Sequence, residues 1–136
     1  MSMLRLSLLG LMFACGLLSC APDGATISEA QYAATIVGDW RGTVGDDNET
    51  ISFRADGRFI SQVRPRGFIS NTLSQGTTGT IRGTWTIEGK VITLSIDSAE
   101  DANVLNKITT STIEMFKQNE LVVRSSRGET STFRRI

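Results

Sequence analysis

The chain has no histidine and only two cysteines. Without histidine it has no Ser-His or Cys-His nucleophile pair and no imidazole general base. With so few thiols, a transition-metal site is not expected. Lysine and arginine number 14, as do aspartate and glutamate, so the chain lacks the strongly basic face that a nucleic-acid binder needs. We therefore predict a non-enzymatic protein with no metal, no cofactor and no nucleic-acid partner.

Long hydrophobic runs are also scarce. The one marked stretch is Leu6–Leu18, which follows the single positive charge of Arg5. As a helix rising about 1.5 Å per residue, it would span roughly 20 Å, short of the ~30 Å hydrocarbon core of a bilayer. A charged start, an apolar centre and a small residue at its end are typical of a secretory signal, which we place at residues 1–19.

The sequence Leu17-Leu18-Ser19-Cys20 ends this stretch and resembles the lipobox of bacterial lipoproteins. The resemblance implies that the Cys20 thiol carries diacylglycerol and that the new amino group is acylated, which anchors the protein to a membrane. Several acyl chains hold a protein stably where one does not. Ala21 follows the cysteine, and by resemblance to enterobacterial sorting this implies the outer membrane, facing the periplasm. The alternative is an ordinary secreted protein with a cysteine at its cleavage site by chance.

The rest of the chain divides into a short lipidated tether, residues 20–27, and one domain, residues 28–136. Cys15 leaves with the signal and Cys20 is acylated, so no disulfide is expected and the domain depends on its core. Ser28 and Gln31 form a plausible capping box for a short helix through about Thr35.

From Val37 onward the apolar residues alternate with polar ones, which indicates strands. We predict eight strands, at Val37–Val44, Glu49–Ala55, Arg58–Arg64, Thr80–Glu88, Lys90–Asp97, Lys107–Phe116, Glu120–Ser126 and Glu129–Ile136. Most are joined by tight turns, which favours an antiparallel meander. The predicted fold is all-β, an eight-stranded antiparallel up-and-down barrel preceded by a short helix, because closure removes exposed sheet edges. A β-sandwich is the alternative.

A Gly-x-Trp motif, Gly38 to Trp40, lies on the first strand, and the last strand carries Arg134 and Arg135. This combination resembles the lipocalin and wider calycin barrels. The resemblance implies that the indole plugs the closed end of the barrel while an arginine stacks on its face. The two arginines point to opposite faces of their strand, and the choice between them stays open.

Two hairpin-like segments, Phe53–Phe59 and Gly83–Leu94, are similar to those of small bacterial lipocalin-like lipoproteins. This chain is shorter than typical lipocalins and lacks the disulfide that many of them have. An eight-stranded barrel is just wide enough for its own side chains or for one small ligand.

The long loop Pro65–Gly79 holds the candidate ligand-binding residues. Arg64 and Arg66 lie beside Phe68 and Ile69. One interpretation is a lid at the barrel mouth, with both apolar side chains partly exposed and an arginine meeting an anionic group. The other is a loop that folds its apolar residues back onto the barrel. The acidic run from Gly45 to Glu49 is interpreted as a hairpin turn.

These observations lead to two functional hypotheses. The first is a lipid-anchored, extracytoplasmic, lipocalin-like protein that binds a small amphipathic or hydrophobic molecule or only its own core. The second is a protein-interaction module of the cell envelope, either a periplasmic inhibitor or an accessory subunit of an envelope complex. An interior with unfilled apolar volume favours the first, and a filled interior with an exposed apolar patch favours the second.

Overall fold

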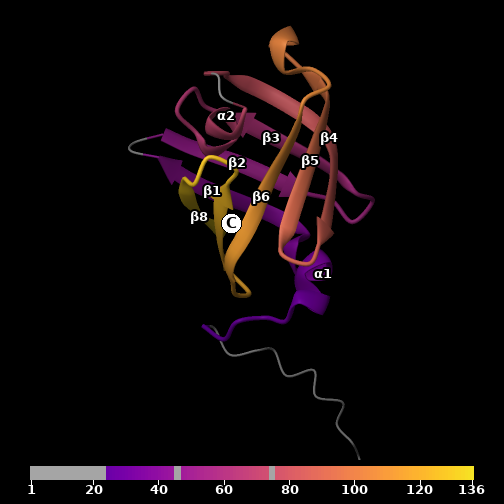
Figure 1. Ribbon diagram of the computed structural model, residues 1–136, viewed down its shortest axis with the longest axis vertical. Coiled ribbons are helices and arrows are strands. Elements are labelled where there is room, and N and C mark those ends of the chain that lie inside the picture. The colour runs from indigo at the N-terminus through magenta and orange to yellow at the C-terminus, as the bar shows by residue number, and fades with distance from the viewer. Residues whose placement is uncertain (1–23, 45–46, 74–75) are drawn as a thin grey trace, which may run out of the picture.

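Alternating side chains and tight turns produce a closed β-barrel (Figure 1). The computed structural model describes residues 24–44, 47–73 and 76–136. The strands are β1 Gly38–Val44, β2 Asp47–Phe53, β3 Arg58–Val63, β4 Gly79–Glu88, β5 Val91–Ala99, β6 Ile108–Phe116, β7 Glu120–Ser125 and β8 Thr130–Arg135. The helical segments are η1 Glu29–Gln31, α1 Tyr32–Ile36, α2 Phe68–Thr72 and η2 Ala102–Val104. The predicted signal at residues 1–19, Cys20 and the start of the predicted tether lie outside the described residues.

Each strand pairs antiparallel with the next along the chain, and β8 returns to pair with β1. The closing register places Trp40 opposite Arg135 and Gly42 opposite Phe133. The predicted eight-stranded up-and-down barrel with a preceding helix is therefore confirmed, and the β-sandwich alternative is wrong. Most predicted strand bounds differ from the observed ones by one or two residues.

The interior of the barrel is filled from one face of every strand, because successive Cβ atoms point to opposite faces. In β4, Ile81 and Trp85 are buried, and in β5, Ile92, Leu94 and Ile96 are buried. Trp85 lies opposite Leu94 in the register of these two strands, so both contribute to the same level of the core. The indole of Trp85 also donates a hydrogen bond to the Arg54 carbonyl at 3.0 Å.

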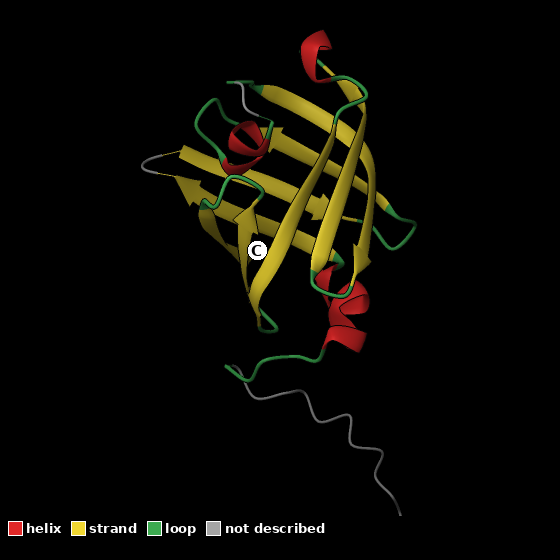
Figure 2. Ribbon diagram, viewed as in Figure 1, coloured by secondary structure: helices red, strands yellow, loops and turns green. Residues whose placement is uncertain are grey.

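Two short helices lie toward opposite ends of the barrel (Figures 1 and 2). Helix α1 leads directly into β1, at the end where the β2–β3, β4–β5 and β6–β7 turns gather. Helix α2 lies in the β3–β4 connection at the other end and contacts β6 and β7. The region Pro65–Gly79, predicted as a loop, thus contains one helical turn and a half. The Ser98–Asn106 connection contains the single 3-10 turn η2.

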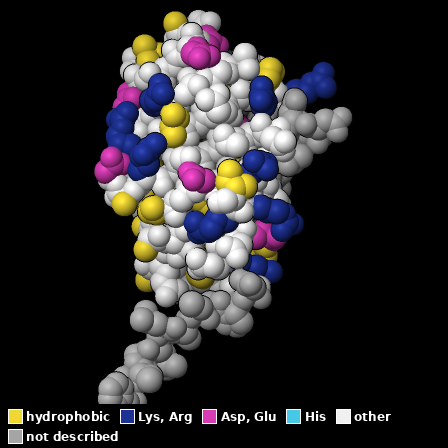
Figure 3. Space-filling view, turned by 180° about the vertical axis from the view of Figure 1, so that it is seen from behind, with side chains coloured by type: hydrophobic (Ala, Val, Ile, Leu, Met, Phe, Trp, Pro, Cys, Tyr) yellow, Lys and Arg dark blue, Asp and Glu magenta, His cyan; other side chains and the backbone are white. Residues whose placement is uncertain are grey.

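The outer surface carries mixed charge, in line with the equal numbers of acidic and basic residues. Seen from behind, basic and acidic side chains lie in small groups, with hydrophobic side chains scattered between them (Figure 3). Within the part of the chain that the structure describes, no helix combines the length and hydrophobicity needed to cross a bilayer.

Candidate functional site

The α1 end of the barrel is shut by Trp40. Its side chain is fully buried, and its Nε1–H donates to the Ile36 carbonyl at 2.8 Å, which ties the end of α1 to the barrel. Phe116 packs edge-on against the indole, with ring centroids 5.9 Å apart. A buried indole with its N–H satisfied seals this end against ligand entry.

Arg135 is the arginine that covers the Trp40 ring, with its Cζ 4.3 Å from the ring centroid. Its Nη1 and Nη2 donate to the carbonyls of Val37 (3.0 Å) and Thr35 (2.6 Å), so the guanidinium also caps the end of α1. Burial lowers the pKa of Arg135 from its ordinary value. Arg134 faces outward instead, where it forms an exposed ion pair with Glu120 at 2.8 Å.

Gly38 makes this arrangement sterically feasible. Its φ is +137°, a conformation that side-chain-bearing residues rarely adopt. A Cβ built on it would also lie 2.5 Å from Arg135 Nη1. The glycine of the Gly-x-Trp motif therefore gives the arginine room to reach the carbonyls behind the indole.

The α2 end is closed by Phe68 and Ile69, which project from α2 into the barrel. They are 6% and 2% exposed, and the Phe68 ring packs edge-on against Phe133 at 5.8 Å. The partial exposure expected for a lid is therefore wrong, because α2 turns these side chains inward. Arg64 and Arg66 remain exposed at the surface, and Arg64 Nε donates to the Asn48 carbonyl at 3.3 Å.

The Glu49 side chain on β2 attaches the first turn of α2 to the barrel. The carboxylate is 2% exposed and accepts hydrogen bonds from the backbone N–H groups of Phe68 (2.8 Å) and Ile69 (3.3 Å). Burial raises the pKa of Glu49 to about 7, although the two backbone hydrogen bonds oppose the rise. A Cβ at Gly67 would lie 2.9 Å from Glu49 Oε2, so glycine lets the chain close over the carboxylate.

The prediction that the acidic run from Gly45 to Glu49 forms a hairpin turn is wrong for Glu49. It lies on β2, two and four positions before the buried Ile51 and Phe53, and therefore points inward with them. That period-two spacing was the sequence signal for its role. Among the residues that the structure describes, no group of three or more potential ligands could hold a metal ion.

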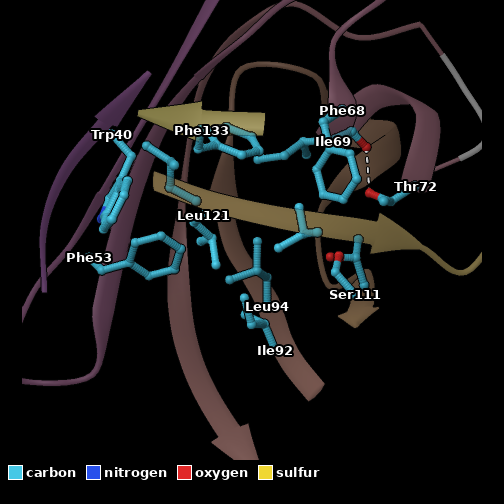
Figure 4. Close-up of a pocket in the computed structure, with 13 residues that line it drawn as sticks. Trp40, Phe53, Phe68, Ile69, Thr72, Ile92, Leu94, Ser111, Leu121 and Phe133 are labelled. Carbon is cyan, nitrogen blue, oxygen red and sulfur yellow. Dashed lines mark hydrogen bonds between the residues drawn. The ribbon is translucent and has the colours of Figure 1, made fainter. Parts of the chain in front are cut away.

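Between α2 and the barrel wall lies a cavity of about 30 Å³ (Figure 4). It is bounded mainly by apolar side chains from both the strands and α2. The lining residues are Trp40, Ile51, Phe53, Phe68, Ile69, Thr72, Ile92, Leu94, Thr109, Ser111, Leu121, Val123 and Phe133. The described lining contains no charged residue, and its polar groups are three hydroxyls. The cavity exceeds the ~10–15 Å³ that one water needs, but is far smaller than the ~150 Å³ cavity known to hold benzene.

Of the candidate ligand residues named from the sequence, Phe68 and Ile69 line this cavity, whereas Arg64 and Arg66 do not. Thr109 and Ser111 line it too, and sequence analysis did not single them out. Both lie on inward positions of β6, where alternation with the exposed Ile108 and Thr110 predicts burial but says nothing of unfilled space.

Comparison with known proteins agrees with this architecture. No protein-family model matches the chain, and none of the curated proteins does. Among solved structures, the chain is similar to a lipocalin-like protein from Bacteroides uniformis, with 18% identity and a TM-score of 0.52 over 75% of this chain and 99% of that one. It is also similar to an uncharacterized protein from Bacteroides eggerthii, with 14% identity and a TM-score of 0.49 over 74% of this chain and 99% of that one. The first of these likenesses, together with the closed topology, identifies the fold of the chain as a lipocalin-like eight-stranded antiparallel barrel.

Proposed function

We propose that this chain is a non-enzymatic, lipid-anchored, extracytoplasmic lipocalin-like protein whose barrel takes up a small apolar or amphipathic molecule. The observation that carries the proposal is the cavity between α2 and the barrel wall, which is bounded almost entirely by apolar side chains. The lipobox resemblance at Leu17–Cys20 supports anchoring through Cys20. Ala21 supports the outer membrane, facing the periplasm.

Apolar walls make desolvation the driving force for binding. A ligand gains about 25 cal/mol for each Å² of apolar surface that it removes from water. At about 30 Å³ the cavity admits little more than one or two water-sized groups while α2 is in place. A ligand with several carbons must therefore displace the side chains of Phe68 and Ile69, which occupy the mouth of the barrel.

Helix α2 is suited to such a displacement because it is short and has few backbone ties to the barrel. Its five residues are too few to be stable as an isolated helix. Glu49 holds its first N–H groups, and the Ser70 hydroxyl donates to the Arg64 carbonyl at 2.6 Å. The opposite end offers no comparable entrance, because Trp40 and Arg135 shut it.

Trp40 lies in the cavity wall, whereas the second tryptophan, Trp85, does not line the cavity, so every titration is made in a Trp85→Phe background in which the fluorescence comes from Trp40. The full processed lipoprotein in phospholipid nanodiscs is titrated with 1-bromohexane, whose bromine quenches an indole on contact. We expect saturable quenching. Ile69→Val removes one methylene from the cavity wall and should shift saturation to lower concentration, whereas Val123→Ile adds one and should shift it to higher concentration.

Thr110→Val is the matched control, because this exposed residue lies on the outer face of β6. It should titrate like the wild type. Partition of the probe into the nanodisc lipid is the same for every variant, so the comparison is unaffected by it. Quenching that is linear and equal in all four proteins would refute ligand binding in the barrel and favour the envelope interaction module.

A further inference from the structure

Two hydroxyl groups on β6 stand out against the apolar wall of the cavity. Thr109 and Ser111 are 5% and 7% exposed, and both line the cavity from inward positions of the same strand. They lie opposite Leu94 and Ile92 of β5, so their immediate cross-strand neighbours are apolar. Figure 4 shows the Ser111 hydroxyl on the cavity side of the strand.

Other buried or half-buried hydroxyls around this end of the barrel have hydrogen-bond partners. Ser61 Oγ donates to the Thr50 carbonyl at 2.6 Å, and Thr72 Oγ1 donates to the Ile69 carbonyl at 2.7 Å. Ser125 Oγ accepts from two backbone N–H groups of its own turn. Among the residues that the structure describes, no fully buried side-chain nitrogen or oxygen lacks a hydrogen-bond partner. The Thr109 and Ser111 hydroxyls have no side-chain hydrogen bond within this part of the chain, so their oxygens keep some accessible surface where the two residues line the cavity.

A hydroxyl that faces an apolar cavity without a protein partner can form a hydrogen bond only with water or a ligand, whereas valine or alanine would fill the same inward positions without any hydrogen-bonding group. We propose that Thr109 and Ser111 form the polar end of the ligand site, and that the ligand is a neutral amphiphile with a hydroxyl or carbonyl group on a short apolar body. This inference rests on the proposed function. Each hydroxyl both donates and accepts, so the pair can bond to an alcohol or to a carbonyl oxygen.

The surrounding charges disfavour an anionic ligand. No cationic side chain lines the described cavity, and Arg64 and Arg66, which sequence analysis offered to an anion, lie exposed on the outer surface. The buried titratable group at this end is the Glu49 carboxylate, which would repel a second anion. An ionised carboxylate without a cation partner is strongly disfavoured in an apolar cavity.

Three probes with the same six-carbon body separate these chemistries: 1-bromohexane, 6-bromohexan-1-ol and 6-bromohexanoate at pH 8. Each is titrated into the full processed lipoprotein in nanodiscs, in the Trp85→Phe background, and binding is followed by the quenching of Trp40 fluorescence. The test variant is Thr109→Val with Ser111→Ala, which removes both hydroxyls. The matched control is Thr110→Val with Thr112→Ala, two exposed positions on the same strand. Because the removed hydroxyls are unpaired, the test variant should keep or raise the wild-type melting temperature.

We expect the test variant to bind 6-bromohexan-1-ol about 5- to 15-fold more weakly, as the loss of one hydrogen bond predicts, and to bind 1-bromohexane at least as well as the wild type. 6-Bromohexanoate should bind wild-type protein at least about 100-fold more weakly than the alcohol. Equal losses for alcohol and bromoalkane, or a carboxylate that binds as tightly as the alcohol, would overturn the polar site while leaving ligand binding intact. If no probe gives saturable quenching, both proposals fall.

Discussion

The buried carboxylate of Glu49 predicts that the barrel loses stability as the pH rises through neutrality. The pKa of this group is about 7 in the folded protein and 4.5 in the unfolded chain. Between these values the folded state holds a proton that the unfolded state has released. The free energy of unfolding therefore falls as pH rises from about 4.5 to 7, and levels off above 7.

The size of the effect follows from the two pKa values. Each pH unit between them is worth about 1.4 kcal/mol, so the full shift corresponds to about 3 kcal/mol. Part of that loss has occurred already at pH 5, which leaves a fall of about 2–3 kcal/mol between pH 5 and pH 8. That is a large fraction of the ~5–15 kcal/mol that stabilises a domain of this size.

Glu49→Gln isolates this contribution, because the amide has nearly the same shape and does not titrate. The amide nitrogen of glutamine is a donor, so it cannot accept the backbone N–H that one carboxylate oxygen accepts in the wild type. One hydrogen bond is therefore lost, but the cost of losing it does not change with pH. Urea unfolding followed by tryptophan fluorescence at pH 5, 6, 7 and 8 gives the difference in unfolding free energy between the two proteins. Every other titrating group is shared and cancels.

The difference between wild type and Glu49→Gln should shift by about 2–3 kcal/mol over this range in favour of the variant at high pH. Two parallel profiles would refute the argument, since they would mean that Glu49 is solvated or already ionised at pH 5. A shift of the opposite sign would mean that the hydrogen bonds from α2 outweigh the burial of the charge.

Three further predictions concern the two ends of the barrel and the anchor. Trp40→Ala should lower the free energy of unfolding in urea by about 3–5 kcal/mol, and Arg135→Gln should lower it by less. A double-mutant cycle with Trp40→Ala should show non-additivity for Arg135 and additivity for the exposed Arg134. Additivity for both arginines would show that the cation–π contact does not stabilise the protein. Phe68→Ser should lower the melting temperature because it removes buried apolar area at about 25 cal/mol per Å², and an unchanged melting temperature would show that α2 is not packed in the barrel. Cys20→Ser should leave uncleaved, unacylated precursor in cell fractionation, and processing like wild type would refute the lipobox interpretation.

The barrel itself was predictable from the sequence because its signal is local. Alternation at Ile92, Leu94 and Ile96, repeated between tight turns, defines strands whose inner faces must meet. Glu49 was predictable in principle by the same alternation with Ile51. It was missed because neighbouring carboxylates made the segment look like a solvated turn.

The candidate site was less accessible to sequence reasoning, because it depends on contacts between distant segments. Helix α2 has little helical propensity of its own in a Gly-, Ser- and Thr-rich loop, and the carboxylate of a residue on β2 caps it. The unfilled space beside Thr109 and Ser111 depends on how side chains from several strands and α2 pack together. The alternation of buried and exposed residues within β6 does not indicate whether the space beside them is filled.

The pairing of β8 with β1 has a consequence for how the protein is made. The hydrogen bonds of Arg135 join positions 98 and 100 residues apart, and the ring of strands closes only when β8 is present. Until synthesis reaches β8, the growing chain has two unpaired strand edges and no cap over its buried indole. Such long-range closure is slow compared with the formation of a local hairpin. The nascent protein should therefore stay without its closed barrel until the last strand has been synthesised, and the export that the proposed function requires would then act on a chain that has not yet closed.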